Sequence, residues 1–148
     1  MAIIASNFKT NHTRKSTKEF IETVNSYLIE NKIENEVLVF PTSSSFDDFD
    51  CVSNLSIGTQ NAYAAKSGSF TGEIGTQQLD EFNIKTILIG HSERRHVLRE
   101  TQEEITKKFE FYKDLGYTIV YCIGEPLEVK EQGLQATLEY VYEQFVGI

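Results

Sequence analysis

The sequence has few of the residues that mark disulfide-linked or metal-binding proteins. It contains two cysteines, two prolines and no tryptophan in 148 residues. Cys51 and Cys122 lie too far apart for a CxxC pair or any usual zinc-ligand spacing. They are therefore expected to be free thiols in a reducing compartment, and no metal site is expected.

A secretion signal and a membrane-spanning run are also missing. Residues 1–9 read MAIIASNFK, which has no basic lead and too short an apolar stretch for a signal peptide. No apolar run approaches the ~20 residues that a transmembrane helix requires. We expect a cytoplasmic protein with no membrane partner.

Positive charge is in the minority. There are 14 lysines and arginines against 22 aspartates and glutamates, which gives a formal net charge of -8. A nucleic acid would have to bind against this overall field, so no nucleic-acid partner is expected. An anionic small molecule is compatible with the charge, because a few cationic side chains can dominate one cleft.

Two glycine-rich phosphate-binding motifs are absent. Residues 62–75 contain Gly68, Gly72 and Gly75, but without the Walker spacing, so this loop is interpreted as a protruding interaction loop. The first strand is followed by NFKTN, which has none of the glycines of a dinucleotide-binding fingerprint. This turn disfavours a dinucleotide-binding sheet.

What the sequence does contain is an alternation of strand and helix patterns. Apolar runs without polar alternation predict buried strands over residues 2–6, 36–40, 55–60, 86–89 and 117–122. Capping boxes at Ser16 with Glu19 and at Thr101 with Glu104 predict two helices, and apolar spacing predicts others over 76–82 and 134–145, with a weak helical turn over 46–49. The pattern predicts one α/β domain, residues 1–148, with five parallel βα units. A doubly wound sheet and a barrel both fit, and the glycine-free first turn favours the barrel.

Chemically capable residues follow three of the predicted strands. Lys9 is either a fixed cation for an anionic substrate or a solvated lysine, and the local sequence does not decide between them. His91 could polarise a carbonyl and move a proton, or it could make a structural hydrogen bond. Glu93 could relay protons or simply favour a helix start. Arg94 and Arg95 are expected to be structural ion-pair or interface residues, and Glu125 a scaffold carboxylate.

Five motifs in order resemble the triosephosphate isomerase family. Residues 7–11 (NFKTN) resemble its first-strand motif Asn-Trp-Lys-x-Asn, and Gln60 with Asn61 the end of its third strand. Residues 70–74 (FTGEI) are similar to its dimer loop, 89–95 (IGHSERR) to its most specific segment, and 122–125 (CIGE) to its fifth strand. The resemblance covers essentially all 148 residues and implies a partial (β/α)8 TIM barrel.

The resemblance also implies a site and a reaction. The family interconverts glyceraldehyde 3-phosphate and dihydroxyacetone phosphate through an enediol, without metal or organic cofactor. Lys9 and Asn7 would bind the phosphorylated triose, His91 would be the neutral electrophile, and Glu93 a supporting carboxylate. A histidine kept neutral by a helix start is a property of the family, not a result of this sequence pattern. The family is a homodimer through residues 68–75, with the implied interface residues Asn11, Thr71, Glu73 and Arg94.

The main departure from the family is length. A complete barrel has eight units and about 250 residues, whereas five units are visible here. The family's general base, a glutamate after the sixth strand, has no counterpart, so we expect this chain to be inactive alone. A second hypothesis is a non-catalytic half-barrel that binds its missing half or a partner. A third is another phosphosugar enzyme with Glu93 or Glu125 as its base.

Overall fold

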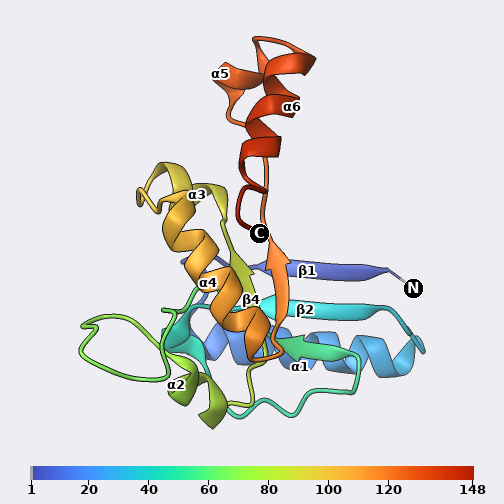
Figure 1. The fold of residues 1–148 in the computed structure, drawn as a ribbon. Helices are drawn as coiled ribbons and strands as arrows, with labels where there is room; N and C mark the ends of the chain where they lie inside the picture. Colours follow the sequence, from blue (N-terminus) through green and yellow to red (C-terminus); the bar gives the residue numbers. More distant parts are fainter. Residues whose placement is uncertain (1) are drawn as a thin grey trace. The chain divides into compact units, whose positions relative to one another are not determined.

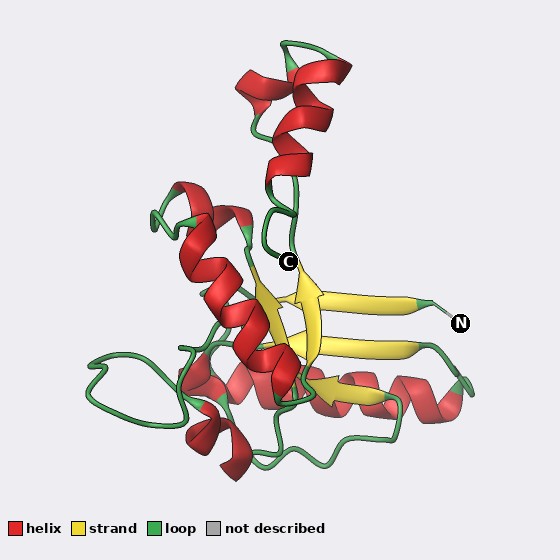
Figure 2. Ribbon diagram, in the orientation of Figure 1, coloured by secondary structure: helices red, strands yellow, loops and turns green. Residues whose placement is uncertain are grey.

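The computed structural model describes residues 2–148. The chain forms two compact units, one ending at Ile87 and the other Leu88–Ile148. Figure 1 follows the chain through both units, and Figure 2 separates its helices from its strands. In the described part of the chain, no helix is both long and apolar enough to cross a membrane.

A parallel sheet forms the centre of the first unit. It contains β1 (Ile3–Asn7), β2 (Glu36–Phe40) and β3 (Leu55–Ile57), in that order. Both pairings are parallel, and Asn7 at the end of β1 lies opposite Phe40 at the end of β2. The third strand is shorter than expected, because residue 59 leaves β3 and instead forms a single parallel bridge with Ile87.

Helix α1 (Arg14–Glu30) packs on this sheet. It begins earlier than predicted: Thr13 is the N-cap and Ser16 is the third helical residue, with reciprocal side-chain to backbone hydrogen bonds. The Ser16–Glu19 capping box was therefore wrong, since Ser16 serves the cap at Thr13 and is not itself the cap. Ile21 and Leu28 are buried against the sheet, whereas Tyr27, which the helical spacing placed with them, is 60% exposed.

The segment after β2 also departs from the predicted pattern. A 3-10 turn, η1, occupies Ser43–Ser45, and Phe46 has extended backbone angles. The helical turn predicted over 46–49 is therefore wrong. A hydroxyl contact between Thr42 and Ser44 supports the earlier turn. Helix α2 (Thr76–Glu81) falls within the predicted range.

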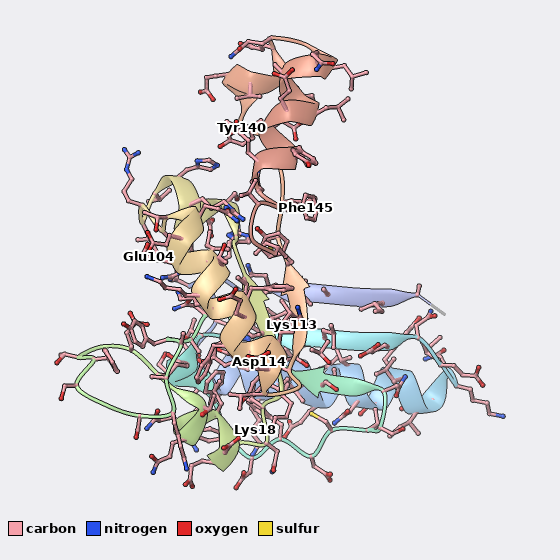
Figure 3. All side chains as sticks on the ribbon, viewed as in Figure 1. Lys18, Glu104, Lys113, Asp114, Tyr140 and Phe145 are labelled. Carbon is pink, nitrogen blue, oxygen red and sulfur yellow. The ribbon has the colours of Figure 1, made fainter. Side chains whose placement is uncertain are left out.

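The strand β4 (Thr86–Ile89), whose last two residues begin the second unit, pairs with β5 (Thr118–Tyr121). All four residues of β4 are buried, as a strand covered on both faces should be. Helix α4 (Gln102–Asp114) connects the two strands and begins with the predicted capping box of Thr101 and Glu104. Figure 3 labels Glu104 in the first turn of this helix and Lys113 and Asp114 at its other end.

Three further helices complete this unit. The short α3 (Ser92–His96) follows β4, and α5 (Leu127–Lys130) and α6 (Leu134–Glu143) follow β5. Neither α3 nor α5 was predicted as a helix, because each is only one turn long and carries no apolar periodicity. The sequence pattern extended α6 two residues too far, to Phe145.

Candidate active site

Asn7 and Lys9 form a tight turn immediately after β1. The Asn7 side-chain oxygen accepts a hydrogen bond from the Lys9 backbone N–H at 2.9 Å. Lys9 has φ +52°, a left-handed conformation that costs about 1–2 kcal/mol for a residue other than glycine. The Asn7 contact compensates part of this cost, so the pair fixes the backbone from which the lysine side chain extends.

Gln60 holds this turn from the segment beyond β3. Its side-chain amide donates to the backbone oxygens of Lys9 and Phe40, each at 2.9 Å. Gln60, which follows β3, thus connects the end of β2 with the turn after β1. In the sequence Gln60 is recognised only as part of a family motif, and no local signal indicates that its partner is residue 9.

His91 caps helix α3 directly after β4. Gly90 turns the chain with φ +78°, and the His91 Nδ1 atom accepts a hydrogen bond from the Glu93 backbone N–H at 3.3 Å. An Nδ1 atom that accepts has no proton, so a neutral His91 carries its proton on Nε2. The half-exposed Glu93 carboxylate lies 3.5 Å from the same Nδ1. It stands in the first turn of α3, where a helix favours negative charge.

The two arginines after Glu93 make internal contacts. Arg94 pairs at 2.9 Å with Glu100, which is only 5% exposed and also binds Lys108. Arg95 donates to the Gly90 backbone oxygen at 2.7 Å and to the Tyr121 hydroxyl at 2.9 Å. Both side chains therefore tie α3 to neighbouring elements of the second unit.

A pocket of about 190 Å³ lies beside His91 within the second unit. Its lining includes Gly90, Cys122, Gly124 and Gln144. Burial raises the pKa of the Cys122 thiol, so this group is protonated and poorly nucleophilic at neutral pH. The Arg95 guanidinium, one imidazole and uncharged polar groups thus line the space, which suits polarisation of a carbonyl better than attack by a thiolate.

Glu125 and Cys51, two other residues with candidate chemistry, do not line this pocket. Glu125 follows Gly124 in the chain but is not part of the described lining. Within residues 2–148, no cluster of three histidine, cysteine, aspartate or glutamate side chains could hold a metal ion. Cys51, whose pKa is also raised by burial, belongs to the first unit.

The long loop of the first unit, residues 62–75, is held at its base by backbone hydrogen bonds and is exposed at its tip. The Tyr63 and Thr76 backbone N–H groups donate to the oxygens of Ile74 and Ala65, at 2.8 and 3.1 Å. At the tip Thr71 is exposed. Asn11 and Glu73, which the resemblance also placed at an interface, are exposed as well. The structure places Asn7, Lys9 and this loop in the first unit and His91 and Glu93 in the second.

Comparison with known proteins gives a consistent result. Residues 2–148 match the family described as Triosephosphate isomerase. The chain is 52% identical over 146 residues to the triosephosphate isomerase of Wolinella succinogenes, covering 99% of this chain and 63% of the relative. It is 53% identical to that of Sulfurimonas denitrificans (99% and 60% covered) and 43% identical to that of Helicobacter hepaticus (100% and 63%). The chain thus spans about three fifths of the length of these relatives.

Proposed function

The chain belongs to the triosephosphate isomerase family, and from this premise we propose that it supplies part of the site that interconverts glyceraldehyde 3-phosphate and dihydroxyacetone phosphate. The family assignment confirms the α/β partial-barrel fold class. The reaction is the transfer of a proton between two neighbouring carbons, through an enediol, and uses no metal or organic cofactor. The protein therefore has to supply an electrophile, a base and a binding site for the phosphate-bearing substrate.

We propose that His91 is the electrophile, and one observation supports this role. Its Nδ1 accepts the Glu93 backbone N–H, so the neutral ring has a proton on Nε2 to donate. A hydrogen bond from Nε2 to the substrate's carbonyl oxygen stabilises the negative charge that develops as the enediolate forms. If Nε2 gives its proton to one substrate oxygen and then takes a proton from the other oxygen, His91 moves a proton between the two oxygens and ends neutral again.

Lys9 is proposed as the cation that holds the phosphorylated triose. Its backbone is fixed on two sides, by Asn7 through the backbone N–H and by Gln60 through the carbonyl. A restrained backbone reduces the entropy that the lysine loses when an anion binds. Asn7 is proposed to share this role, and Glu93 to support the site without contacting the reacting carbons.

We propose that the 148 residues are inactive by themselves. The family's general base, in the resemblance a glutamate after a sixth strand, has no counterpart among these 148 residues. Neither Glu93, which lies against His91 Nδ1, nor Glu125 is proposed as a substitute. The complete enzyme is proposed to act in the cytoplasm as a homodimer through residues 68–75, with Asn11, Thr71, Glu73 and Arg94 near the interface.

Reconstitution tests this assignment. The 148-residue chain is mixed with the separately produced remainder of the Wolinella succinogenes relative, and isomerase turnover is measured. We expect turnover in the mixture that falls about 10²–10⁴-fold when His91 is replaced by glutamine. His96→Gln is the matched control, because His96 is exposed at the other end of α3, and it should leave turnover unchanged. Equal activity of the two variants would remove His91 from the mechanism.

A second candidate function, a non-catalytic assembly module, is supported by exposed apolar surface within each unit. Ile3 and Ile4 on the edge strand β1 are 64% and 52% exposed, and Leu134 and Tyr142 on α6 are each 74% exposed. Such surface favours association with another polypeptide. Light scattering with a hydrophobic dye tests it: a monomer that binds no dye would count against this candidate.

A further inference from the structure

A chain of polar side chains in the second unit connects the end of α6 to the turn that carries His91. Its members are Arg95, Gln102, Tyr121 and Gln144, which come from α3, α4, β5 and the residue after α6. Gln144 is 6% exposed. No part of this network was visible in the sequence, because its members are separated by up to several tens of residues.

The hydroxyl of Tyr121 is the junction of the network. It donates to the backbone oxygen of Gln144 and accepts from the Arg95 guanidinium at 2.9 Å. The Gln102 side-chain nitrogen donates to the Tyr121 hydroxyl oxygen at 3.4 Å and to the Gln144 backbone oxygen at 3.0 Å. A hydroxyl has one donor and two acceptor positions, so all of its hydrogen-bonding capacity is used here.

Arg95 transmits this arrangement to the His91 turn. Its Nε donates to the Gly90 oxygen at 2.7 Å, and its Nη1 donates to Gln102 at 2.7 Å. The contact is close: a Cβ atom on Gly90 would lie 2.6 Å from Arg95 Nη2 and 3.1 Å from the Cys122 oxygen. Because Gly90 also has φ +78°, the turn before His91 has little freedom to shift.

The opposite wall of the pocket is held by the same network. The Gln144 side chain accepts from the Gly124 N–H at 3.2 Å and donates to the Gly124 oxygen at 2.9 Å. Tyr121 and Gln102 fix the Gln144 backbone, so both ends of this residue are restrained. Phe145, labelled in Figure 3 just beyond α6, packs its ring 5.9 Å from that of Tyr121.

We propose that Tyr121 is a positioning residue that, through Arg95 and Gly90, holds the His91 imidazole in its Nε2-protonated orientation. The relevance of Tyr121 to catalysis rests on the proposed function of His91. The hydrogen bonds from Arg95 to Tyr121 and to Gly90 do not depend on that function. The end of α6 thereby acts on the electrophile: displacing the Gln144 carbonyl releases Tyr121, then Arg95, and then the turn that aims the histidine ring.

Imidazole nitrogen spectra of the isotope-labelled 148-residue chain test this proposal without measuring turnover. At a pH where the ring is neutral, His91, assigned with His91→Gln, is expected to show one tautomer, with the proton on Nε2. In Tyr121→Phe the two nitrogen resonances are expected to move toward each other, as two tautomers become averaged. Tyr142→Phe is the control, because it removes the same hydroxyl from a side chain that is 74% exposed, and the His91 signals should not change.

A second variant keeps the test decisive if Tyr121→Phe does not fold. Gln102→Glu keeps an acceptor for Arg95 and loses the donor to the Gln144 and Val146 oxygens, so it should produce the same loss of a single tautomer. A merely structural tyrosine would lower the unfolding temperature and leave the His91 signals as they are. Unchanged His91 signals in every folded variant would overturn the proposal, and the function of His91 would still be judged separately by reconstitution.

Discussion

Gln60 lies 51 residues from Lys9 in sequence, yet its side-chain nitrogen donates to the Lys9 backbone oxygen at 2.9 Å. The same nitrogen donates to the Phe40 oxygen, which the Phe8 N–H also binds at 3.0 Å. The left-handed Lys9 backbone is thus restrained by a residue that no local pattern connects to it. This relationship predicts how the first unit should respond when the amide is changed.

Gln60→Glu should destabilise the first unit by about 1–2 kcal/mol, because it removes the donor and sets a carboxylate against two carbonyl oxygens. The measurement is urea unfolding at neutral pH. Gln77→Glu is the matched control, since Gln77 is exposed on α2 and should tolerate the same change. Equal unfolding midpoints for the two variants would show that the amide does not hold the turn.

Glu100 should be the most sensitive carboxylate of the second unit. It is 5% exposed and faces both Arg94 and Lys108, whose side chain is 10% exposed. Glu100→Gln leaves these cations without their counterion, so we expect a loss of about 3–5 kcal/mol in the free energy of unfolding.

The matched control for this change lies in the first turn of α4. Glu103 pairs with Lys107, but the two side chains are 77% and 64% exposed. Glu103→Gln should therefore cost less than about 1 kcal/mol. Chemical denaturation measures both losses. Similar losses for the two variants would show that the buried position of Glu100 does not make its ion pairs more important.

The capping box of α4 predicts a pH dependence. Hydrogen bonds from the Thr101 backbone and hydroxyl lower the pKa of Glu104. A carboxylate with a lowered folded-state pKa stabilises the protein above its unfolded-state pKa, about 4.3, and loses that contribution as the pH falls through the folded-state value. The stability difference between the wild type and Glu104→Gln should therefore be full at neutral pH and disappear in acid.

The control for that experiment is Glu110→Gln, an exposed carboxylate on the same helix. Its stability difference from the wild type should not show the acid-dependent loss assigned to the cap. Thermal unfolding measured across this pH range checks both variants. A constant difference for Glu104→Gln at every pH would mean that the cap does not depend on the charge.

Local patterns predicted well the elements that local physics determines. The apolar run at β4 and the capping box of Thr101 and Glu104 were both confirmed. The start of α1 was misplaced, because Thr13 and Ser16 both offer a capping hydroxyl and only three-dimensional geometry shows which of them caps the helix.

Long-range polar contacts could not be predicted in the same way. Tyr121 lies in a predicted buried strand. Its ring fits the apolar pattern of that strand, but the pattern does not predict any partner for its hydroxyl. Gln144 resembles any polar residue at the end of an amphipathic helix. Their partnership depends on how β5 and α6 pack, which sequence spacing does not encode. The resemblance identified His91 and Lys9, and the contacts that restrain them came only from the structure.

The most direct test of the central claim is isomerase turnover by the purified 148-residue chain, with its intact mass confirmed. We propose that this chain carries an electrophile, His91, and a substrate-binding cation, Lys9, but no general base. We therefore expect no turnover from the chain alone. Turnover approaching the diffusional ceiling known for this family, if abolished by His91→Gln, would contradict the account and show that a carboxylate within these residues removes the substrate's proton.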